Sequence, residues 1–160
     1  MGQYVFFSAN NSVHGYELWM TDVTANNTVL LKDISAGASS SDPTDFTALG
    51  DNVLFVANDG ATGRELWVTN GTTGGTVLLK DIKPGAASSN PSDLQVLGDK
   101  VLFQADDGTT GKELWITDGT TDGTVMLKDL YVAEWADLTL RDGSSSVPHD
   151  FTAIGDKVLF

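Results

Sequence analysis

A tripeptide of Glu, Leu and Trp occurs three times in the chain at a constant spacing of 48 residues. The three copies occupy residues 17–19, 65–67 and 113–115. Two segments one step apart, 53–82 and 101–130, are identical at 21 of 30 positions. Repetition at this period indicates that one supersecondary unit is used several times and that neighbouring units bury their apolar faces against each other.

The repeat divides the chain into about three units within a single repeat domain, 1–160. The units span roughly 3–48, 49–96 and 97–153, and a partial unit spans 154–160. Pro43 and Pro91 keep the 48-residue step, but Pro91 and Pro148 are 57 residues apart. The third unit therefore carries nine extra residues between Leu130 and Pro148.

Each unit has the pattern of four short strands joined by tight turns. In the second unit the expected strands are 45–50, 52–58, 64–69 and 76–82. Gly-Asp, Asp-Gly and Asn-Gly pairs separate them, and β-branched and aromatic residues fill them. No segment has the period of an amphipathic helix. The sequence therefore predicts an all-β protein of repeated antiparallel sheets.

The turn centres predict the strand register. They place Phe55 opposite Trp67, Trp67 opposite Leu78, and Glu65 opposite Lys80. The opposite face of the same sheet is expected to carry Leu54, Val56, Leu66, Val68, Val77 and Leu79. Because both faces are apolar, each sheet must be covered on both sides. Stacked four-stranded blades solve this problem, so the expected architecture is a β-propeller or a propeller segment.

Three residue types recur once per unit, and we expect them to be structural. The tryptophans are Trp19, Trp67 and Trp115, which we expect to fill the space between adjacent blades. The glutamates are Glu17, Glu65 and Glu113, each with a lysine expected opposite. The lysines are Lys32, Lys80 and Lys128. An active site needs only one copy of a charged residue, so a charge that recurs in every unit is more typical of a structural role.

The phrases "ELWVTNGT" and "ELWITDGT", preceded by "DGxTG" and followed by "GTVxLKD", resemble the ELWxxDGT repeat of bacterial proteins. This resemblance implies a tandem-repeat protein that is mostly exported, and hence an extracellular or cell-surface location. It does not imply a reaction. The first unit departs from the pattern, with Val23 in place of Gly71 and Asn27 in place of Gly75. Because valine rarely takes left-handed backbone angles, we expect that hairpin to turn differently.

Charge and composition exclude several classes of partner. The chain has 22 acidic and 9 basic residues, a net charge of −13. Binding to nucleic acid or to an anionic membrane surface requires a basic face, so neither partner is expected. No apolar run approaches the length of a membrane span, and no signal peptide is visible. The absence of cysteine excludes disulfides and thiol chemistry.

The residues that could perform catalysis or hold a metal do not form a recognisable motif. His14 and His149 are expected to fill surface turns, and no triad, phosphate loop or zinc spacing is present. We therefore expect no enzyme activity and no cofactor. Acidic turns at 57–60, 105–108 and 117–120 offer oxygens to calcium, but they lack the alternating acidic ladder of a calcium loop.

The insertion at 131–147 is the one segment that does not repeat. It contains Tyr131, Glu134, Trp135 and Arg141, and a combination of aromatic residues with arginine is typical of binding hot spots. These four are the candidate contacts of a non-enzymatic scaffold or recognition module that binds protein or glycan. Three alternatives remain: Trp135 caps the edge of a blade, the unit is purely structural and self-assembling, or a hydrolase site lies in the insertion.

The number of strands predicts either self-association of copies into a ring or filament, or a place for this segment in a longer repeat array. Residues 3–7 match the second strand of a unit, and 150–160 match a first strand and the start of a second. Terminal sheets would expose apolar faces and strand edges, which attract other chains. The segment 151–155 is expected to serve as the missing first strand beside 4–7, within one chain or between two.

Overall fold

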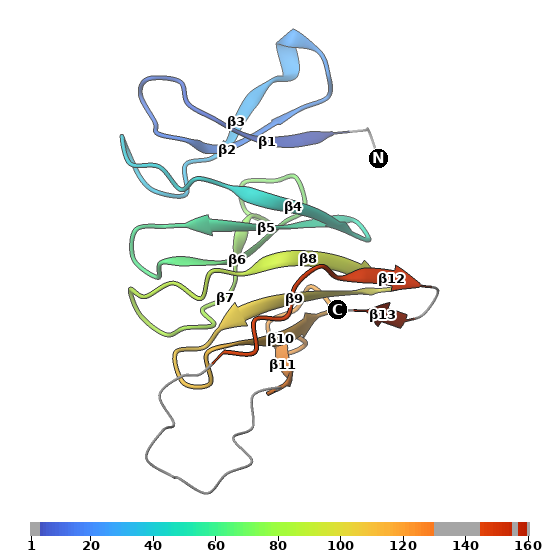
Figure 1. Cartoon of the computed structure of the whole chain (residues 1–160). Coiled ribbons are helices and arrows are strands. Elements are labelled where there is room, and N and C mark those ends of the chain that lie inside the picture. Colours follow the sequence, from blue (N-terminus) through green and yellow to red (C-terminus); the bar gives the residue numbers. More distant parts are fainter. Residues whose placement is uncertain (1–3, 130–144, 155–156, 160) are drawn as a thin grey trace, which may run out of the picture.

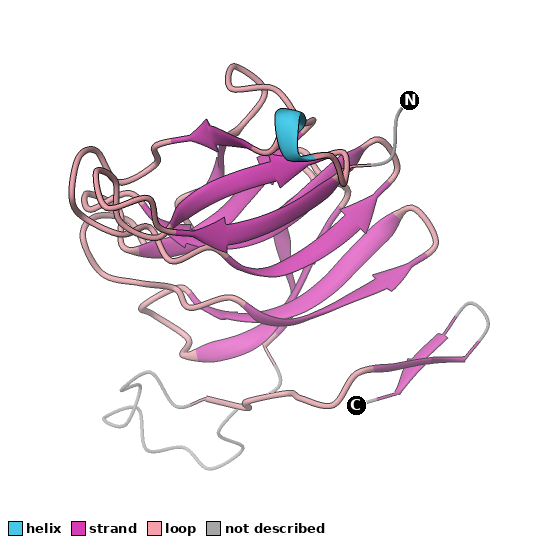
Figure 2. Cartoon of the chain, turned by 90° about the horizontal axis from the view of Figure 1, so that it is seen from above, coloured by secondary structure: helices cyan, strands magenta, loops and turns pink. Residues whose placement is uncertain are grey.

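The computed structural model describes residues 4–129, 145–154 and 157–159, and these residues form an all-β protein (Figure 1). They contain β-strands and one short 3-10 helix, and no α-helix occurs among them. The sequence prediction of an all-β fold is therefore confirmed. Figure 2 shows the strands, in magenta, joined at their ends by loops, in pink.

The strands of the described residues form four antiparallel sheets, A to D, whose order follows the chain. Sheet A contains β1 (Val5–Ala9), β2 (Glu17–Thr21) and β3 (Val29–Lys32), with the 3-10 helix η1 (Ala25–Asn27) between the last two. Sheet B contains β4 (Thr44–Leu49), β5 (Asn52–Asn58), β6 (Arg64–Thr69) and β7 (Val77–Lys80). Sheet C contains β8 (Ser92–Leu97), β9 (Lys100–Asp106), β10 (Lys112–Thr117) and β11 (Val125–Lys128). Sheet D contains β12 (Thr152–Ile154) and β13 (Lys157–Leu159).

The predicted strands of the second unit match sheet B. Strands β5 and β6 have the predicted bounds, and β4 and β7 lie within one or two residues of theirs. The register also agrees at two points, since Phe55 pairs with Trp67 and Trp67 with Leu78.

The predicted pairing of Glu65 with Lys80 is wrong. Lys80 pairs with Leu66 instead, because the register between β6 and β7 shifts by one residue between Leu66 and Trp67. Sheets A and C have the same irregularity at the equivalent place. A β-bulge of this kind inserts one residue on one strand, which counting from the turn cannot reveal.

The sheets stack face to face and bury two apolar clusters. One cluster joins sheets B and C and includes Leu54, Leu66 and Leu79 from B with Phe103 and Trp115 from C. The other joins sheets A and B through residues on their facing sides (Leu18, Leu31 and Ile34 with Phe55, Ala57 and Trp67). Sheet B is therefore covered on both faces, as the sequence predicts, and Figure 1 shows the successive layers.

The hairpin of the first unit follows its equivalents at Val23, contrary to the prediction, and differs from them at Ala25–Asn27, which form the 3-10 helix η1. Val23 has a φ of 64°, close to the 82° of Gly71 and the 87° of Gly119. Asp22 accepts hydrogen bonds from Thr24, as Asn70 does from Thr72. Side-chain hydrogen bonds thus impose the left-handed position on valine at a cost in backbone strain.

Candidate interaction surface

The recurring glutamates are fully buried and bind the linker that follows each sheet. The Glu65 carboxylate accepts hydrogen bonds from the Ser89 hydroxyl (2.6 Å), the Ser89 amide (2.7 Å) and the Ile82 amide (2.9 Å). Glu17 makes the same set with Ser41 and Ile34. Each carboxylate therefore fastens a long connection to the first residues of the third strand of its unit.

The same contact holds across the nine-residue insertion. The Ser146 hydroxyl donates to Glu113 at 2.6 Å, so Ser146 takes the place of Ser89. The serine before each of these makes a recurring contact too. The hydroxyl oxygen of Ser88 accepts a hydrogen bond from the backbone amide of Arg64, and that of Ser145 accepts one from the backbone amide of Lys112. A recurring Ser-Ser-x-Pro sequence marks this contact, and sequence reasoning overlooked it.

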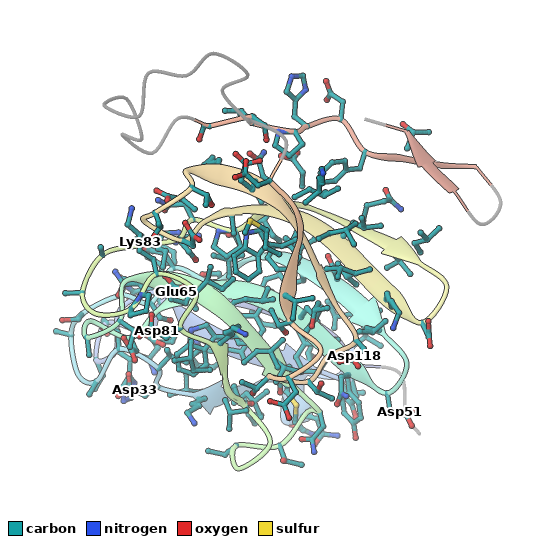
Figure 3. All side chains as sticks on the ribbon, turned by 90° about the horizontal axis from the view of Figure 1, so that it is seen from below. Asp33, Asp51, Glu65, Asp81, Lys83 and Asp118 are labelled. Carbon is teal, nitrogen blue, oxygen red and sulfur yellow. The ribbon has the colours of Figure 1, made fainter. Side chains whose placement is uncertain are left out.

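Burial raises the pKa of the Glu65 carboxyl, and the nearby charge of Asp81 acts in the same direction. The hydrogen bonds from Ser89 and Ile82 oppose this shift. Figure 3 shows Glu65, Asp81 and Lys83 at one end of the strands, away from Asp51 and Asp118. The Glu65 carboxyl is fully buried and accepts its hydrogen bonds from the linker, so its role is structural.

Two of the recurring lysines, Lys32 and Lys80, donate hydrogen bonds to the unit that follows their own in the chain. Lys32 Nζ donates to the carbonyl oxygen of Thr76 at 2.6 Å, and Lys80 Nζ donates to that of Thr124 at 2.7 Å. A second bond runs in the reverse direction, because the Thr73 hydroxyl donates to the carbonyl oxygen of Leu31 at 2.9 Å. We call this pair of contacts the inter-unit link. The third lysine, Lys128, is exposed.

The recurring tryptophans differ in their surroundings. Trp67 is 5% exposed and Trp115 is 7% exposed, each packed against the preceding sheet. Trp19 is only half-buried. Within sheet A, Phe6 and Met20 pack toward sheet B. Successive residues of a strand point to opposite faces, so Trp19, next to Met20, lies on the face of sheet A that points away from sheet B.

Sheet A thus has an outer face, which we define by Val5, Phe7, Trp19 and Leu30. Phe7 pairs with Trp19 and Trp19 with Leu30, the same row as Phe55, Trp67 and Leu78 in sheet B. Val5 is 51% exposed, and the other three are half-buried. This apolar row, which contains the aromatic rings of Phe7 and Trp19, is the candidate functional site among the described residues.

The other end of the stack has a matching exposed position. Leu31 is 5% exposed and Leu79 is 4% exposed, because a following sheet covers each of them. Their equivalent on β11, Leu127, is 50% exposed. Leu127 and Lys128 together mark the uncovered part of sheet C.

The acidic turns use their carboxylates internally. Asp59 Oδ1 accepts hydrogen bonds from the amides of Ala61 and Thr62, and Asp107 Oδ1 accepts from those of Thr109 and Thr110. Although partial burial acts in the opposite direction, these donors lower the pKa of Asp59. In the described part of the chain, no group of three or more histidine or acidic side chains could hold a metal ion.

Other candidate residues are placed as follows. His14 contacts Asn11 through Nδ1 at 3.2 Å, and His149 contacts Asp150 at 2.8 Å, so each histidine contacts a residue close to it in the chain. Tyr131, Glu134, Trp135 and Arg141 lie outside the described residues. Among the residues described, no helix has the length and apolar character needed to span a membrane.

Comparisons with models of known protein families, with curated proteins and with solved structures find no match to this chain.

Proposed function

We propose that this chain is a non-enzymatic repeat scaffold of an exported bacterial protein and that it recognises a protein partner through the outer face of sheet A. The observation that supports this proposal is the row Phe7, Trp19 and Leu30. The equivalent row in sheets B and C lies against a neighbouring sheet. Aromatic residues of this kind are enriched at the buried centre of protein–protein interfaces.

The charged groups support a scaffold over an enzyme. Glu17, Glu65 and Glu113 are fully buried and accept hydrogen bonds from the linkers. Lys32 and Lys80 bind carbonyl oxygens of the next unit. These groups are thus used for holding units together, which is the task of a scaffold.

The finer architecture belongs to the same proposal. Face-to-face stacking of four-stranded antiparallel sheets at a constant sequence step is typical of propeller blades. We infer that sheets B and C are complete blades and that sheets A and D each contribute part of one.

The experiment measures access to the outer face with Nile red, a neutral dye whose fluorescence rises on apolar surfaces. At low protein concentration we expect the wild type to bind the dye and Trp19→Glu to lose most of that signal. Val77→Glu is the matched control, since Val77 is 44% exposed but lies on β7. The proposal fails if Nile red does not bind, or if both variants lower the signal equally. Circular dichroism checks that both variants keep the all-β fold.

A further inference from the structure

The two internal interfaces show what each sheet presents to its neighbours. The row of Phe55, Trp67 and Leu78 meets sheet A on the side that carries Leu31. The equivalent row in sheet C, which includes Trp115, meets sheet B on the side that carries Leu79. At the A–B and B–C interfaces, an aromatic row therefore meets the leucine side of the preceding sheet.

The two ends of the stack carry the two halves of this same interface. The outer face of sheet A has the aromatic row in the same register, with Trp19 at its centre. At the other end, Leu127 is 50% exposed and Lys128 is exposed. The equivalents of Lys128 donate to turn carbonyls of a following unit.

The strand edges are complementary as well. Strands β4, β8 and β12 lie side by side in succession, each the first strand of its sheet, whereas sheet A begins with β1 at its edge. In sheet B, Ala48 pairs with Val53, and in sheet D, Ala153 pairs with Val158. In the sequence repeat Val5 occupies the position of Val53 and Val158. Strand β1 therefore fits beside β12 in the register that β13 now has.

We propose that the outer face of sheet A binds the exposed end of sheet C in a second copy of this chain, head to tail, with β12 of that copy pairing alongside β1. This inference rests on the proposed function and names its partner. In the resulting contact Trp19 covers Leu127, Val5 lies opposite Ala153, and Lys128 Nζ donates to the carbonyl oxygen of Thr28.

Strand β13 yields its place to β1 of the second copy. The pairing that is lost involves only the three residue pairs between β12 and β13. The pairing that forms has the same register and is accompanied by β2 and β3, which cover Leu127. Removing these apolar side chains from water favours association.

Contacts of this kind are heterologous, because the two surfaces differ. Repetition of one heterologous contact closes into a ring if the rotation per copy allows it and otherwise extends into a filament. Both outcomes contain the same interface.

The test uses single cysteines, for which the cysteine-free chain is a clean background. One variant carries Val5→Cys and the other Ala153→Cys. Under mild oxidation we expect disulfide-linked dimers when the two variants are mixed and essentially none when either is alone. Non-reducing electrophoresis and mass spectrometry of the linked peptides identify the pair. A mixture of Val29→Cys with Ala153→Cys is the control for random collision.

Two results would overturn the inference. Dimers of Val5→Cys alone would show that two sheet A faces meet symmetrically. Absence of the mixed dimer, together with a monomer in light scattering at increasing concentration, would show that no second copy binds. If Nile red still binds at the outer face in that second case, the proposed function stands and only the second copy as partner fails. If the dye does not bind either, the proposed function fails too.

A gain of association tests the same geometry. The first unit has Ala25 at the position of Thr73 and Thr121, whose hydroxyls donate to the carbonyl oxygens of Leu31 and Leu79. We expect Ala25→Thr to supply a donor to the Leu127 carbonyl oxygen of the second copy and to lower the dimer dissociation constant several-fold. Lys128→Met is expected to raise that constant. Unchanged constants in both variants would contradict the proposed contact.

Discussion

The carboxylate of Glu65 is surrounded by donors that come from a linker rather than from a neighbouring strand. Its oxygens accept two hydrogen bonds from Ser89 and one from Ile82, and the side chain is fully buried. A buried carboxylate is costly unless it is hydrogen-bonded. The serine is therefore as important to the fold as the glutamate.

We predict that Ser89→Ala lowers the free energy of unfolding by about 1.5–3 kcal/mol, because the carboxylate of Glu65 loses a short hydrogen bond in a buried place. Urea denaturation followed by fluorescence measures the change. Ser39→Ala, at an exposed serine of the preceding linker, is the control and is expected to have little effect. Equal stability of the two variants would show that the Ser89 hydroxyl contributes nothing.

The raised pKa of Glu65 predicts a pH dependence. The ordinary pKa is 4.5, and the folded value is higher because burial disfavours the charge. The folded state thus holds this proton more tightly, and the associated stability is complete below the unfolded pKa and is lost as pH rises through the folded pKa.

We therefore expect the stability advantage of the wild type over Glu65→Gln to shrink as the pH rises above the ordinary carboxyl pKa of 4.5. All other titrating groups are common to both proteins, so the difference isolates Glu65. Urea denaturation at several pH values measures it. A difference that stays constant with pH would contradict a raised pKa.

At the scale of single elements, the β2–β3 hairpin contains the clearest strain. Val23 has a φ of 64° and is 81% exposed, so it has little packing to offset its conformation. A left-handed conformation costs a residue with a Cβ about 1–2 kcal/mol. Glycine avoids this cost but has a larger conformational entropy in the unfolded chain.

We predict that Val23→Gly raises the free energy of unfolding by up to about 1 kcal/mol, since relief of strain exceeds the entropy term. The reverse change, Gly71→Val, is the matched variant and is expected to lower it by about 1–2 kcal/mol. Thermal unfolding of the two variants checks both signs. A loss of stability in Val23→Gly would refute the assignment of strain.

Elements also show how far sequence reasoning reaches. The strand bounds and the pairing of Phe55 with Trp67 could be predicted, because alternation and turn residues fix them locally. The pairing of Glu65 with Lys80 could not, because the bulge beside Trp67 adds a residue that no local pattern reveals. The contact between Glu65 and Ser89 joins residues 24 apart and depends on the path of the linker. Its one sequence signal is the recurring Ser-Ser-x-Pro.

At the scale of the whole molecule, the row that is buried in two sheets and half-buried in sheet A is predictable only in part. The repeat places Trp19, Trp67 and Trp115 at equivalent positions. Their different exposure follows from the order of the sheets in the stack, which is a property of the assembled chain. Sequence reasoning also allowed β12 to pair with β1 within one chain, but β12 pairs with β13 there.

The third linker offers a test of the repeat itself. Ser146 binds Glu113 across nine more residues than separate Ser89 from Glu65. We predict that replacing residues 130–144 with the six residues 82–87 keeps the fold and raises the free energy of unfolding by roughly 0.3 kcal/mol, through a shorter closed loop.

This replacement removes Tyr131, Glu134, Trp135 and Arg141 together. Nile red binding at the outer face and the mixed disulfide are expected to persist, because both depend on the ends of the stack. Urea denaturation and the cysteine assay measure the two effects. Loss of association on this replacement would assign partner binding to the insertion instead.

The inter-unit link also bears on how such a chain could arise. In both of its hydrogen bonds one partner is a main-chain carbonyl oxygen, that of Thr76 or that of Leu31. Mutations that change the side chains of the accepting residues therefore leave the carbonyl acceptors in place. A gene segment that encodes 48 residues brings its own lysine donor and its own acceptors when it is copied in tandem. Lengthening by duplication thus needs no accompanying mutations, and recombination between copies can add or remove whole units without disturbing those that remain.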